Sequence, residues 1–334
     1  MSMEHQYITL AHGNGGRLMR ELIEEIFARH LHNPVLDTQA DAACLHQIEG
    51  EIMMTTDGFS VQPLEFPGGN IGSLAIHGTV NDLAVAGARP LYLTLNAFIE
   101  EGLETALLNR IVMSLAQAAR EANVNIVAGD TKVVQRGQGG GLYLATTGIG
   151  VKLIQHMGIH QIRPGDHILV SGPVGDHGTA VMLAREQFGI RGDLQSDATS
   201  VLPLTLALAE LKGLRFMRDP TRGGLASVMQ EIHRACGHGI RLIQASIPIR
   251  DPVNAVCEIL GFDPLYLACE GRVVAIVDPA DSAQALAKWQ QLPQGADAAI
   301  IGSVNEQQHV VLQTPLGGER ILEELEDEPL PRIC

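Results

Sequence analysis

The sequence of 334 residues is poor in aromatic residues, in positive charge and in paired cysteines, and each shortage excludes a class of protein. Aromatic residues make up 4% of the chain, which is too few for a platform that stacks nucleic-acid bases. The formal net charge of −15 opposes binding to a phosphate backbone or to an anionic membrane. We therefore expect neither nucleic acid nor a membrane as a partner.

The cysteines are odd in number and contain no Cys-x-x-Cys pair. A disulfide framework and a compact zinc site are therefore not expected, and the pattern suits the reducing cytoplasm. There is no charged-then-apolar leader and no apolar run of about 18 residues, so we expect neither a signal peptide nor a membrane span. Four cysteines lie in apolar surroundings and are predicted to be small core residues: Cys44, Cys236, Cys257 and Cys269.

Apolar residues make up 46% of the chain, which is enough for the cores of two domains. Strand-like and helix-like patterns alternate in both halves, so we predict two α/β domains with an α+β order. The expected divisions are residues 1–155, residues 156–321 and a C-terminal tail, residues 322–334. Expected helices include 17–30, 70–87, 103–122 and 253–260. Expected strands include 41–47, 51–56, 91–98 and 265–268, with a final hairpin of 299–304 and 309–313.

The predicted tail is acidic, contains two prolines and ends at a cysteine, Cys334. Such a segment buries little apolar surface, so we expect it to be mobile and extended. At ~3 Å per residue, about ten extended residues would reach roughly 30 Å. The thiol would then visit a site on its own protein and a site on another protein. The alternative is a terminal cysteine without a role, because chain ends are often loose.

Several aspartates adjoin apolar runs in a way that suggests a site for phosphate and metal. Asp57 and Asp130 each end a predicted strand, Asp41 opens one, and Asp82 lies in a largely apolar helix. Carboxylates that converge at strand ends repel one another unless a cation such as Mg²⁺ bridges them. Taken singly, each aspartate is better explained as a turn, cap or solvent-facing residue.

Two glycine-rich segments and two further charged residues complete the candidate site. The glycines of 12–16 and 219–224 would bring backbone N–H groups to phosphates, although neither segment is a known phosphate-binding fingerprint. Lys132 follows Asp130 and Thr131 and would neutralise phosphate, or else is a solvated surface lysine. Glu270 lies between two apolar runs, where a raised pKa would suit a base; the alternative is a hairpin-turn residue.

Five motifs, in this order, resemble those of the HypE family, the carbamoyl dehydratases of nickel–iron hydrogenase maturation. They are Thr55-Thr-Asp-Gly58, Asn81-Asp-Leu-Ala-Val-Ala-Gly-Ala88, Ala128-Gly-Asp-Thr131, Asp219-Pro-Thr-Arg-Gly-Gly-Leu225 and Pro331-Arg-Ile-Cys334. The resemblance covers essentially the whole chain, and the final motif singles out the maturation branch. The wider superfamily is similar to aminoimidazole ribonucleotide synthetase, selenophosphate synthetase and thiamine monophosphate kinase.

The resemblance implies a two-domain fold of the aminoimidazole ribonucleotide synthetase type, with a flexible C-terminal tail. It implies a homodimer that pairs the N-terminal sheets, with ATP and Mg²⁺ near the shared interface. The residues implied to bind them are Asp41, Asp57, Asp82, Asp130, Thr131 and Asp219, with Asp57, Asp82 and Asp130 as metal ligands. Several relatives carry two adjacent aspartates where this chain has Asp41 before two alanines.

The resemblance also implies a chemistry for the terminal thiol. Cys334 would receive a carbamoyl group from the carbamoyltransferase HypF and carry this S-carbamoylcysteine into the ATP site. Phosphorylation of the carbamoyl oxygen and removal of the N–H protons would leave a thiocyanate, S-cyanocysteine. We expect Lys132 to stabilise the transferring phosphoryl group or the oxygen and Glu270 to take the proton. The cyanide would pass to iron on a HypC–HypD complex.

Two other functions stay open at this point. An ATP-dependent enzyme of the same superfamily that acts on a free small molecule would not need Cys334. A thiol-bearing scaffold without catalysis would leave the series of aspartates unexplained. A metal carrier would need clustered soft ligands, which the scattered cysteines do not supply.

Overall fold

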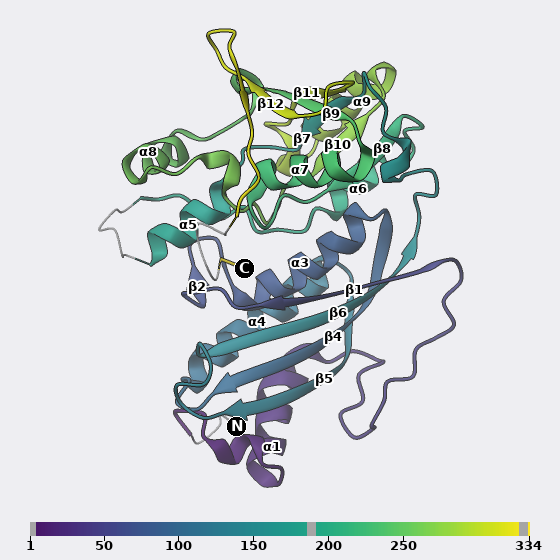
Figure 1. Ribbon diagram of the computed structural model, residues 1–334. Coiled ribbons are helices and arrows are strands. Elements are labelled where there is room, and N and C mark those ends of the chain that lie inside the picture. The colour runs from purple at the N-terminus through teal and green to yellow at the C-terminus, as the bar shows by residue number, and fades with distance from the viewer. Residues whose placement is uncertain (1–4, 186–191, 327–332) are drawn as a thin grey trace.

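The structure is a computed structural model that describes residues 5–185, 192–326 and 333–334 (Figure 1). One sheet is built from the chain before Lys152 and a second sheet from the chain after His167. The long helix α3 (Ile71–Val85) lies between them and contacts elements of both halves. In the described part of the chain, no helix combines the length and the apolar character that a membrane crossing requires.

The N-terminal sheet has four strands in the order β1-β6-β4-β5. Their bounds are β1 (Ile52–Phe59), β6 (Leu142–Lys152), β4 (Ala88–Glu100) and β5 (Asn125–Val134). Only β4 and β5 are parallel in this sheet, and α4 (Thr105–Glu121) forms the crossover that a parallel pair requires. Helices α3 and α4 pack against each other, and α3 covers β1, β6 and β4.

The two faces of this sheet differ in what covers them. Side chains alternate between faces along a strand, and α3 covers the face that we call the inner face. The opposite face, which we call the outer face, carries exposed apolar side chains: Ile52 is 57% exposed, Met54 72% and Phe98 41%. Cross-strand partners continue this face through Tyr143 and Ile149 of β6. An uncovered apolar surface of this kind marks a contact site.

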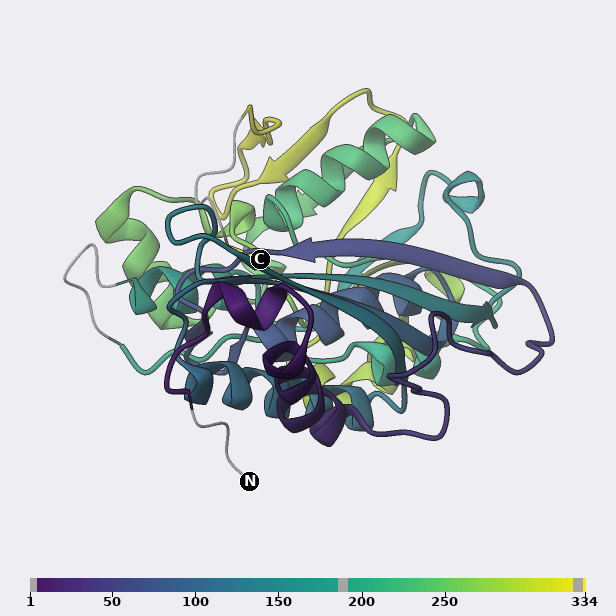
Figure 2. The ribbon, with the colours of Figure 1, turned by 90° about the horizontal axis from the view of Figure 1, so that it is seen from below.

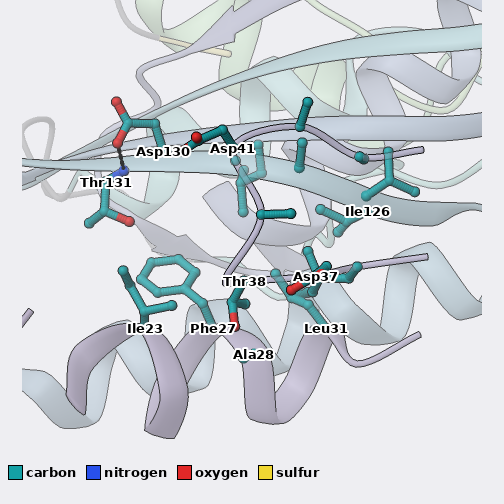
Figure 3. A pocket seen from close by; sticks show the side chains of 18 residues that line it. Ile23, Phe27, Ala28, Leu31, Asp37, Thr38, Asp41, Ile126, Asp130 and Thr131 are labelled. Carbon is teal, nitrogen blue, oxygen red and sulfur yellow. Dashed lines mark hydrogen bonds between the residues drawn. The ribbon is translucent and has the colours of Figure 1, made fainter. Parts of the chain in front are cut away.

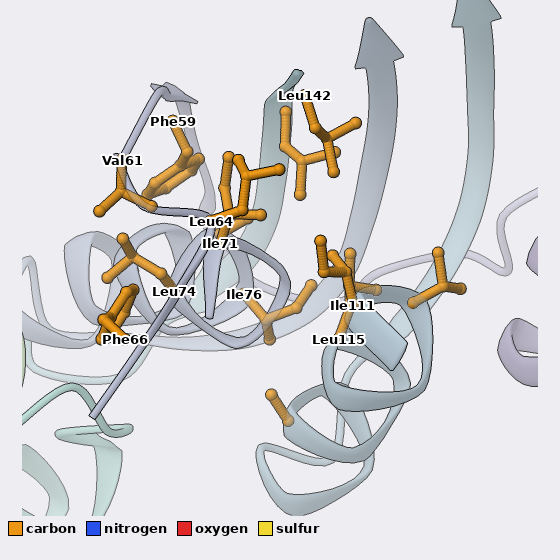
Figure 4. Close-up of a cluster of buried hydrophobic side chains, with 14 of the residues drawn as sticks. Phe59, Val61, Leu64, Phe66, Ile71, Leu74, Ile76, Ile111, Leu115 and Leu142 are labelled. Carbon is orange, nitrogen blue, oxygen red and sulfur yellow. The ribbon is translucent and has the colours of Figure 1, made fainter. Parts of the chain in front are cut away.

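The sequence explains why α3 is buried on nearly all sides. Asn70 caps the helix, its side chain accepting the N–H groups of Gly72 and Ser73, and the residues that follow are almost all apolar or small. Gly78 lets the helix approach β1, because a Cβ there would lie 2.7 Å from the Phe59 ring. Figure 4 shows Leu74 and Ile76 of this helix in the same hydrophobic core as Phe59 of β1.

The N-terminal helix is confirmed but is not a regular α-helix throughout. It comprises α1 (Arg17–Leu22), a π-helical segment (Ile23–Ala28) and α2 (Arg29–Leu31). Figure 2 shows these turns beside α4, which they contact.

The C-terminal sheet has seven strands in the order β13-β12-β9-β11-β7-β10-β8. Their bounds are β13 (Glu319–Ile321), β12 (Val310–Gln313), β9 (Gly239–Ile243), β11 (Ala299–Asn305), β7 (His167–Val170), β10 (Val274–Val277) and β8 (Leu214–Arg218). The helices are α5 (Asp176–Ala184), α6 (Leu202–Leu208), α7 (Gly224–Cys236), α8 (Asp251–Leu260) and α9 (Pro279–Gln290). Ile168 packs in a core with α7, whereas Leu169 packs in a core with α6 and α9, so helices cover both faces.

Three expectations about elements are wrong. Residues 41–47 form no strand, and residues 265–268 overlap a 3₁₀ turn (Pro264–Tyr266) that Asp263 caps. Strands β11 and β12 do not pair as a hairpin, because β9 lies between them and pairs with both. The edge strand β13 and the short pair β2 (Glu65–Phe66) and β3 (Gly69–Asn70) carry no signal long enough to be read from the sequence.

Candidate functional site

A pocket of about 600 Å³ lies between the inner face of the N-terminal sheet and the C-terminal half. It is the place where five of the predicted site residues meet. They are Asp57, Asp82, Asp219, Glu270 and Cys334. The N-terminal half supplies the first two and the C-terminal half supplies the others.

Two aspartates from neighbouring elements form one wall of the pocket. Asp57 lies on the inner face of β1, and the Asp82 side chain extends from α3 into the same pocket. The Thr55 hydroxyl on β1 donates to Asp82 Oδ2 over 2.8 Å, which fixes the helix carboxylate against the strand. Burial raises the pKa of Asp82 despite this hydrogen bond, and the nearby Asp57 raises it further.

The segment 218–224 supplies a buried carboxyl group and a cation. Burial, with Asp82 as the next cause, raises the pKa of Asp219 to about 7. Arg222 lies within 3.2 Å of Asp57 Oδ1, so it links the loop to the N-terminal half. Two glycines with positive φ turn the chain into α7, and a Cβ on Gly224 would lie 2.5 Å from the Leu267 carbonyl oxygen. Only glycine fits this approach to the segment that leads to Glu270.

Glu270 is 3% exposed, and its Oε1 has no hydrogen-bond partner among the residues that the structure describes. Its backbone is held from two sides: Asp197 Oδ1 accepts its N–H over 3.1 Å, and Asn81 Nδ2 donates to its carbonyl oxygen over 3.1 Å. Burial raises the pKa of Glu270 well above its usual value, and the carboxyl groups of Asp219, Asp197 and Asp57 raise it further. A buried carboxyl group with a free oxygen is a candidate acid or base.

The C-terminal cysteine is docked in this pocket. The Cys334 carbonyl oxygen accepts the Ser60 N–H over 3.1 Å, and the side chain of Ile333 is 3% exposed. Arg222 hydrogen-bonds to the Cys334 side chain. Burial and the nearby Glu270 nevertheless raise the pKa of Cys334 to about 12. The docked thiol is therefore protonated at neutral pH and is a poor nucleophile there.

The predicted tail of residues 322–334 is not wholly loose. Leu322 is fully buried in the C-terminal core, and the Tyr266 hydroxyl donates to the Glu323 carbonyl oxygen over 2.7 Å. The tail therefore begins after these anchors rather than at Leu322. The expected mobility of 327–332 concerns a segment outside the described residues.

Of the other predicted site residues, Asp130 and Lys132 project from the outer face of β5, Thr131 points to the opposite face, and Asp41 lies beside the β5 edge of the sheet. Asp130 pairs with Asn96, Asn96 with Ala145, and Ala145 with Gly58, so these four side-chain positions share one face. Asp57 precedes Gly58 and therefore points to the opposite face. The structure does not bring Asp130 to Asp57 within one chain.

Asp130, Thr131 and Asp41 line a second pocket of about 180 Å³ (Figure 3). Its floor is apolar and includes Phe27, and its rim holds the carboxylates of Asp41 and Asp130. Asp41 reaches this rim from an irregular segment rather than from the predicted strand. Pocket and rim together suit a ligand with one apolar and one charged end.

Lys132 lies beside the second pocket and not beside Cys334. Its Nζ is 3.0 Å from Asp130 Oδ2, and both side chains are more than half exposed. The hydrogen bond from Lys132 lowers the pKa of Asp130. The structure therefore places Lys132 and Glu270 in different sites of the same chain.

Metal ligation was predicted for Asp57, Asp82 and Asp130. Within residues 5–185, 192–326 and 333–334, no group of three or more His, Cys, Asp or Glu side chains is arranged to hold a metal ion. Asp57 and Asp82 do lie together, and the nearby Asp57 contributes to the raised pKa of Asp82, so the pocket disfavours two unneutralised charges. Mg²⁺ commonly uses one or two carboxylates plus substrate phosphates, so this pair fits it.

Three positioning residues were not predicted from the sequence. Asn81 and Arg222 lie inside motifs that drew attention to their aspartates and glycines. The motifs could have indicated these two residues, but the functional roles were given to the neighbouring residues. Asp197 follows the undescribed segment 186–191 and lies in no motif. Only the fold shows that it reaches the backbone of Glu270.

Comparisons with known proteins show the family to which the chain belongs. Residues 39–152 match the AIR synthase related protein, N-terminal domain, and residues 163–314 match the AIR synthase related protein, C-terminal domain. The chain is 48% identical to a carbamoyl dehydratase HypE from Azotobacter vinelandii, over 100% of this chain and 99% of that protein. The predicted two-domain fold of this type is confirmed.

Two solved structures are also similar to this chain. The hydrogenase maturation protein HypE in complex with ATP has a TM-score of 0.93 and 43% identity, covering 98% of this chain and 99% of that chain. A chain of a HypE–HypF complex has a TM-score of 0.79 and 43% identity, covering 92% and 99%.

Proposed function

The chain belongs to the HypE family of hydrogenase maturation proteins, and on that premise we propose that it is an ATP-dependent carbamoyl dehydratase. Its substrate is a carbamoyl group carried on the Cys334 thiol, and its product is a thiocyanate on the same sulfur. The thiocyanate supplies cyanide ligands for the iron centre of nickel–iron hydrogenase.

One observation carries this proposal: the terminal thiol lies in the pocket that holds the unpartnered Glu270. A free-substrate enzyme would have no reason to dock its own last residue there. A scaffold would have no reason to bury Asp219 and Glu270 beside it, because buried carboxyl groups are costly.

The chemistry needs a phosphoryl donor and a base. The carbamoyl oxygen of S–C(=O)–NH₂ attacks the γ-phosphorus of ATP, and ADP leaves. Loss of one N–H proton gives S–C(=NH)–O-phosphate, in which the nitrogen is neutral and the phosphate group keeps its negative charge, and loss of the second proton forms C≡N as phosphate leaves. The products are S–C≡N, ADP, phosphate and protons, so the water is removed as phosphate oxygen and protons.

We assign the base to Glu270. Its unpartnered Oε1 can accept an N–H proton from a carbamoyl group on the neighbouring sulfur. Burial raises its pKa, so its carboxylate, once formed, is a stronger base than an exposed glutamate. Arg222 beside the Cys334 side chain holds the sulfur end of the substrate.

ATP and Mg²⁺ are the cofactors of the proposal. Asp57 and Asp82, with phosphate oxygens of ATP, would bind the metal ion, and the ion would neutralise phosphate charge. Asp219, which lines the same pocket as Asp57 and Asp82, would also bind ATP. Asp41, Asp130 and Thr131 would bind ATP at the second pocket, and Lys132 would neutralise phosphate there. One of these binding regions lies between the sheet and the C-terminal half, and the other lies at the β5 edge of the sheet. They would form one ATP site where two copies of the chain bring them together.

The proposed partners follow from the same surfaces. The exposed apolar outer face, with Met54 and Phe98, supports a homodimer through the N-terminal sheets. Because the docked thiol is protonated, loading by the carbamoyltransferase HypF requires Cys334 to leave the pocket. A HypC–HypD complex in the cytoplasm would accept the cyanide.

Intact-protein mass spectrometry tests the proposal. The chain is incubated with the carbamoyltransferase and carbamoyl phosphate, and ATP is then supplied, with Cys334→Ala as control. We expect a gain of one carbamoyl group on the wild type, followed by loss of one water, and no change in the control. A wild type that stays unmodified would contradict the proposal and favour a free-substrate ATP enzyme.

A further inference from the structure

The C-terminal dipeptide Ile333-Cys334 is held in the pocket by the side chain of Ile333 and by the backbone carbonyl oxygens of both residues. Ile333 is buried in the same hydrophobic cluster as Val181 and Leu267. The Cys334 carbonyl oxygen accepts the Ser60 N–H, as described above. The Ile333 carbonyl oxygen lies 2.8 Å from His177 Nε2. Ser60 uses its backbone N–H for its contact, whereas His177 uses an ionisable side chain that is fully buried.

The hydrogen bonds around His177 fix its tautomer. Ser196 Oγ accepts the Ala198 N–H over 3.0 Å, so its own proton is available for His177 Nδ1 at 2.8 Å. With Nδ1 as an acceptor, Nε2 carries the hydrogen and donates it to the Ile333 carbonyl oxygen. Burial lowers the pKa of His177, which agrees with a neutral ring. Phe66 packs edge-on against this ring at 5.4 Å between centroids.

The loop that orients His177 also orients Glu270. Asp197 follows Ser196 directly and accepts the N–H groups of Glu270 and Gly271. The Ser196 N–H donates to the Pro67 carbonyl oxygen over 2.8 Å, which ties the loop to the N-terminal half. One short loop thus links the docked dipeptide, through His177, to the backbone of the base.

We propose that His177 is a positioning residue that holds the docked Ile333-Cys334 dipeptide and links its docking to the placement of Glu270. The role of Glu270 in this inference rests on the proposed function, whereas the docking contact does not. Withdrawal of the dipeptide leaves the Nε2–H buried without its partner, so the contact favours the docked state. His177 touches no reacting atom, because its partner is the carbonyl oxygen of the residue before the cysteine.

A pair of variants of similar length separates the hydrogen bond from packing. His177→Gln keeps an amide N–H near the position of Nε2, whereas His177→Met removes the donor. In the full-length chain, the rate of Cys334 alkylation by iodoacetamide reports undocking, because the docked Cys334 is half-buried and its thiol is protonated. We expect alkylation about ten-fold faster in His177→Met and close to the wild-type rate in His177→Gln.

The native cysteines provide the controls for the alkylation experiment. Cys44 is exposed, so its alkylation rate should be the same in all variants. Cys257 and Cys269 are buried, so their alkylation would reveal a variant that fails to fold. Ser196→Ala is the second variant: it frees Nδ1 from its donor, and we expect a smaller acceleration in the same direction.

The second readout is single-turnover dehydration of the preloaded S-carbamoyl chain after ATP is added. We expect a rate about ten-fold lower in His177→Met, with unchanged ATP affinity and recovery in His177→Gln. Equal alkylation of Cys334 in the wild type, His177→Met and Ser196→Ala would overturn the inference. Equal loss of dehydration in His177→Met and His177→Gln would also overturn it. A wild type that never loses water would instead refute the proposed function, and the alkylation experiment would still decide on His177.

Discussion

The carboxyl groups on the two sides of the N-terminal sheet differ in their electrostatic surroundings. In the pocket that faces the inner side, burial raises the pKa values of Asp82, Asp219 and Glu270, which extend from α3 and from the C-terminal half. On the outer face, the hydrogen bond from Lys132 lowers the pKa of Asp130. The protonation of a carboxyl group therefore depends on which side of the sheet it faces. Burial beneath the second domain favours the protonated form, whereas an exposed position beside a cation favours the charged form.

This difference assigns different tasks to the two faces. The inner pocket suits proton transfer and a cation, because its carboxyl groups are crowded and buried. The outer face suits contact with a second protein chain and with a charged ligand, because its apolar side chains are exposed and Asp130 is ion-paired with Lys132 at the surface. Four changes would break or sharpen this comparison.

The largest effect is expected for Glu270→Gln on the inner face. The amide keeps the shape but takes no proton, so we expect dehydration of the preloaded chain to fall by roughly 10²–10⁴-fold with ATP affinity nearly intact. Quenched samples analysed by intact mass would show S-carbamoylcysteine that persists after ATP is added. Glu231→Gln is the matched control, because Glu231 lines the same pocket but is ion-paired with Arg218 at the surface. Normal thiocyanate formation in Glu270→Gln would remove it from the mechanism.

The next effect is expected on the outer face. The double variant Met54→Glu and Phe98→Glu puts like charges on the proposed dimer contact, so we expect dimer dissociation to increase by at least about 100-fold. Sedimentation equilibrium measures this change. Ile259→Glu on α8 is the control, because Ile259 is 69% exposed and lies outside the sheet. A double variant with the mass and affinity of a wild-type dimer would place the contact elsewhere.

The third change tests the buried carboxyl group of Asp219 by its effect on stability. Its pKa is raised from 3.8 to about 7, so the folded state retains a proton that the unfolded state releases. The resulting stabilisation is complete below the unfolded pKa and is lost as the pH rises from about 4 to about 7, by up to about 4 kcal/mol. Urea unfolding should show this slope in the wild type and a flatter profile in Asp219→Asn. Asp297→Asn, at an exposed site, should keep the wild-type slope. Parallel profiles for all three proteins would contradict the assignment.

The smallest effect on stability is expected for Lys132→Met. An exposed ion pair contributes at most about 1 kcal/mol, so the free energy of unfolding should barely change. The KM for ATP should nevertheless rise if Lys132 neutralises phosphate, and Cys334 alkylation should stay unchanged. Lys152→Met, which removes a similar ion pair with Glu51, serves as the control for loss of one charge. A Lys132→Met enzyme with faster Cys334 alkylation would mean that the two faces are coupled more closely than the structure indicates.

The sequence predicted most elements where long apolar patterns decide them. Helix α4 and strand β4 are close to their expected positions because their periodicity is set locally. The order of the C-terminal strands could not be predicted, because β9 enters between β11 and β12 through contacts far apart in the chain. The segment 41–47 was mistaken for a strand because its apolar residues have no pairing partner that the pattern could reveal.

The candidate site was predictable in part for the same reason. Motifs identified Asp57, Asp82, Asp219 and Cys334, and the position between two apolar runs identified Glu270. The fold brings all five to one pocket. Motifs alone could not show that Asp130 projects from the other face, since strand register sets this direction. His177 and Asp197 act through backbone groups of other residues, so their side chains carry no pattern of their own.

The most direct test of the account asks which face the terminal thiol visits. In a Cys44→Ser background, Glu270→Cys and Lys132→Cys are each treated with a short fluorogenic reagent that links two thiols. Peptide mapping then identifies links within one chain. The account predicts a link between Cys334 and the cysteine at position 270, and none to position 132 of the same chain. A link to position 132 without one to position 270 would contradict it, because the thiol would then belong to the outer face.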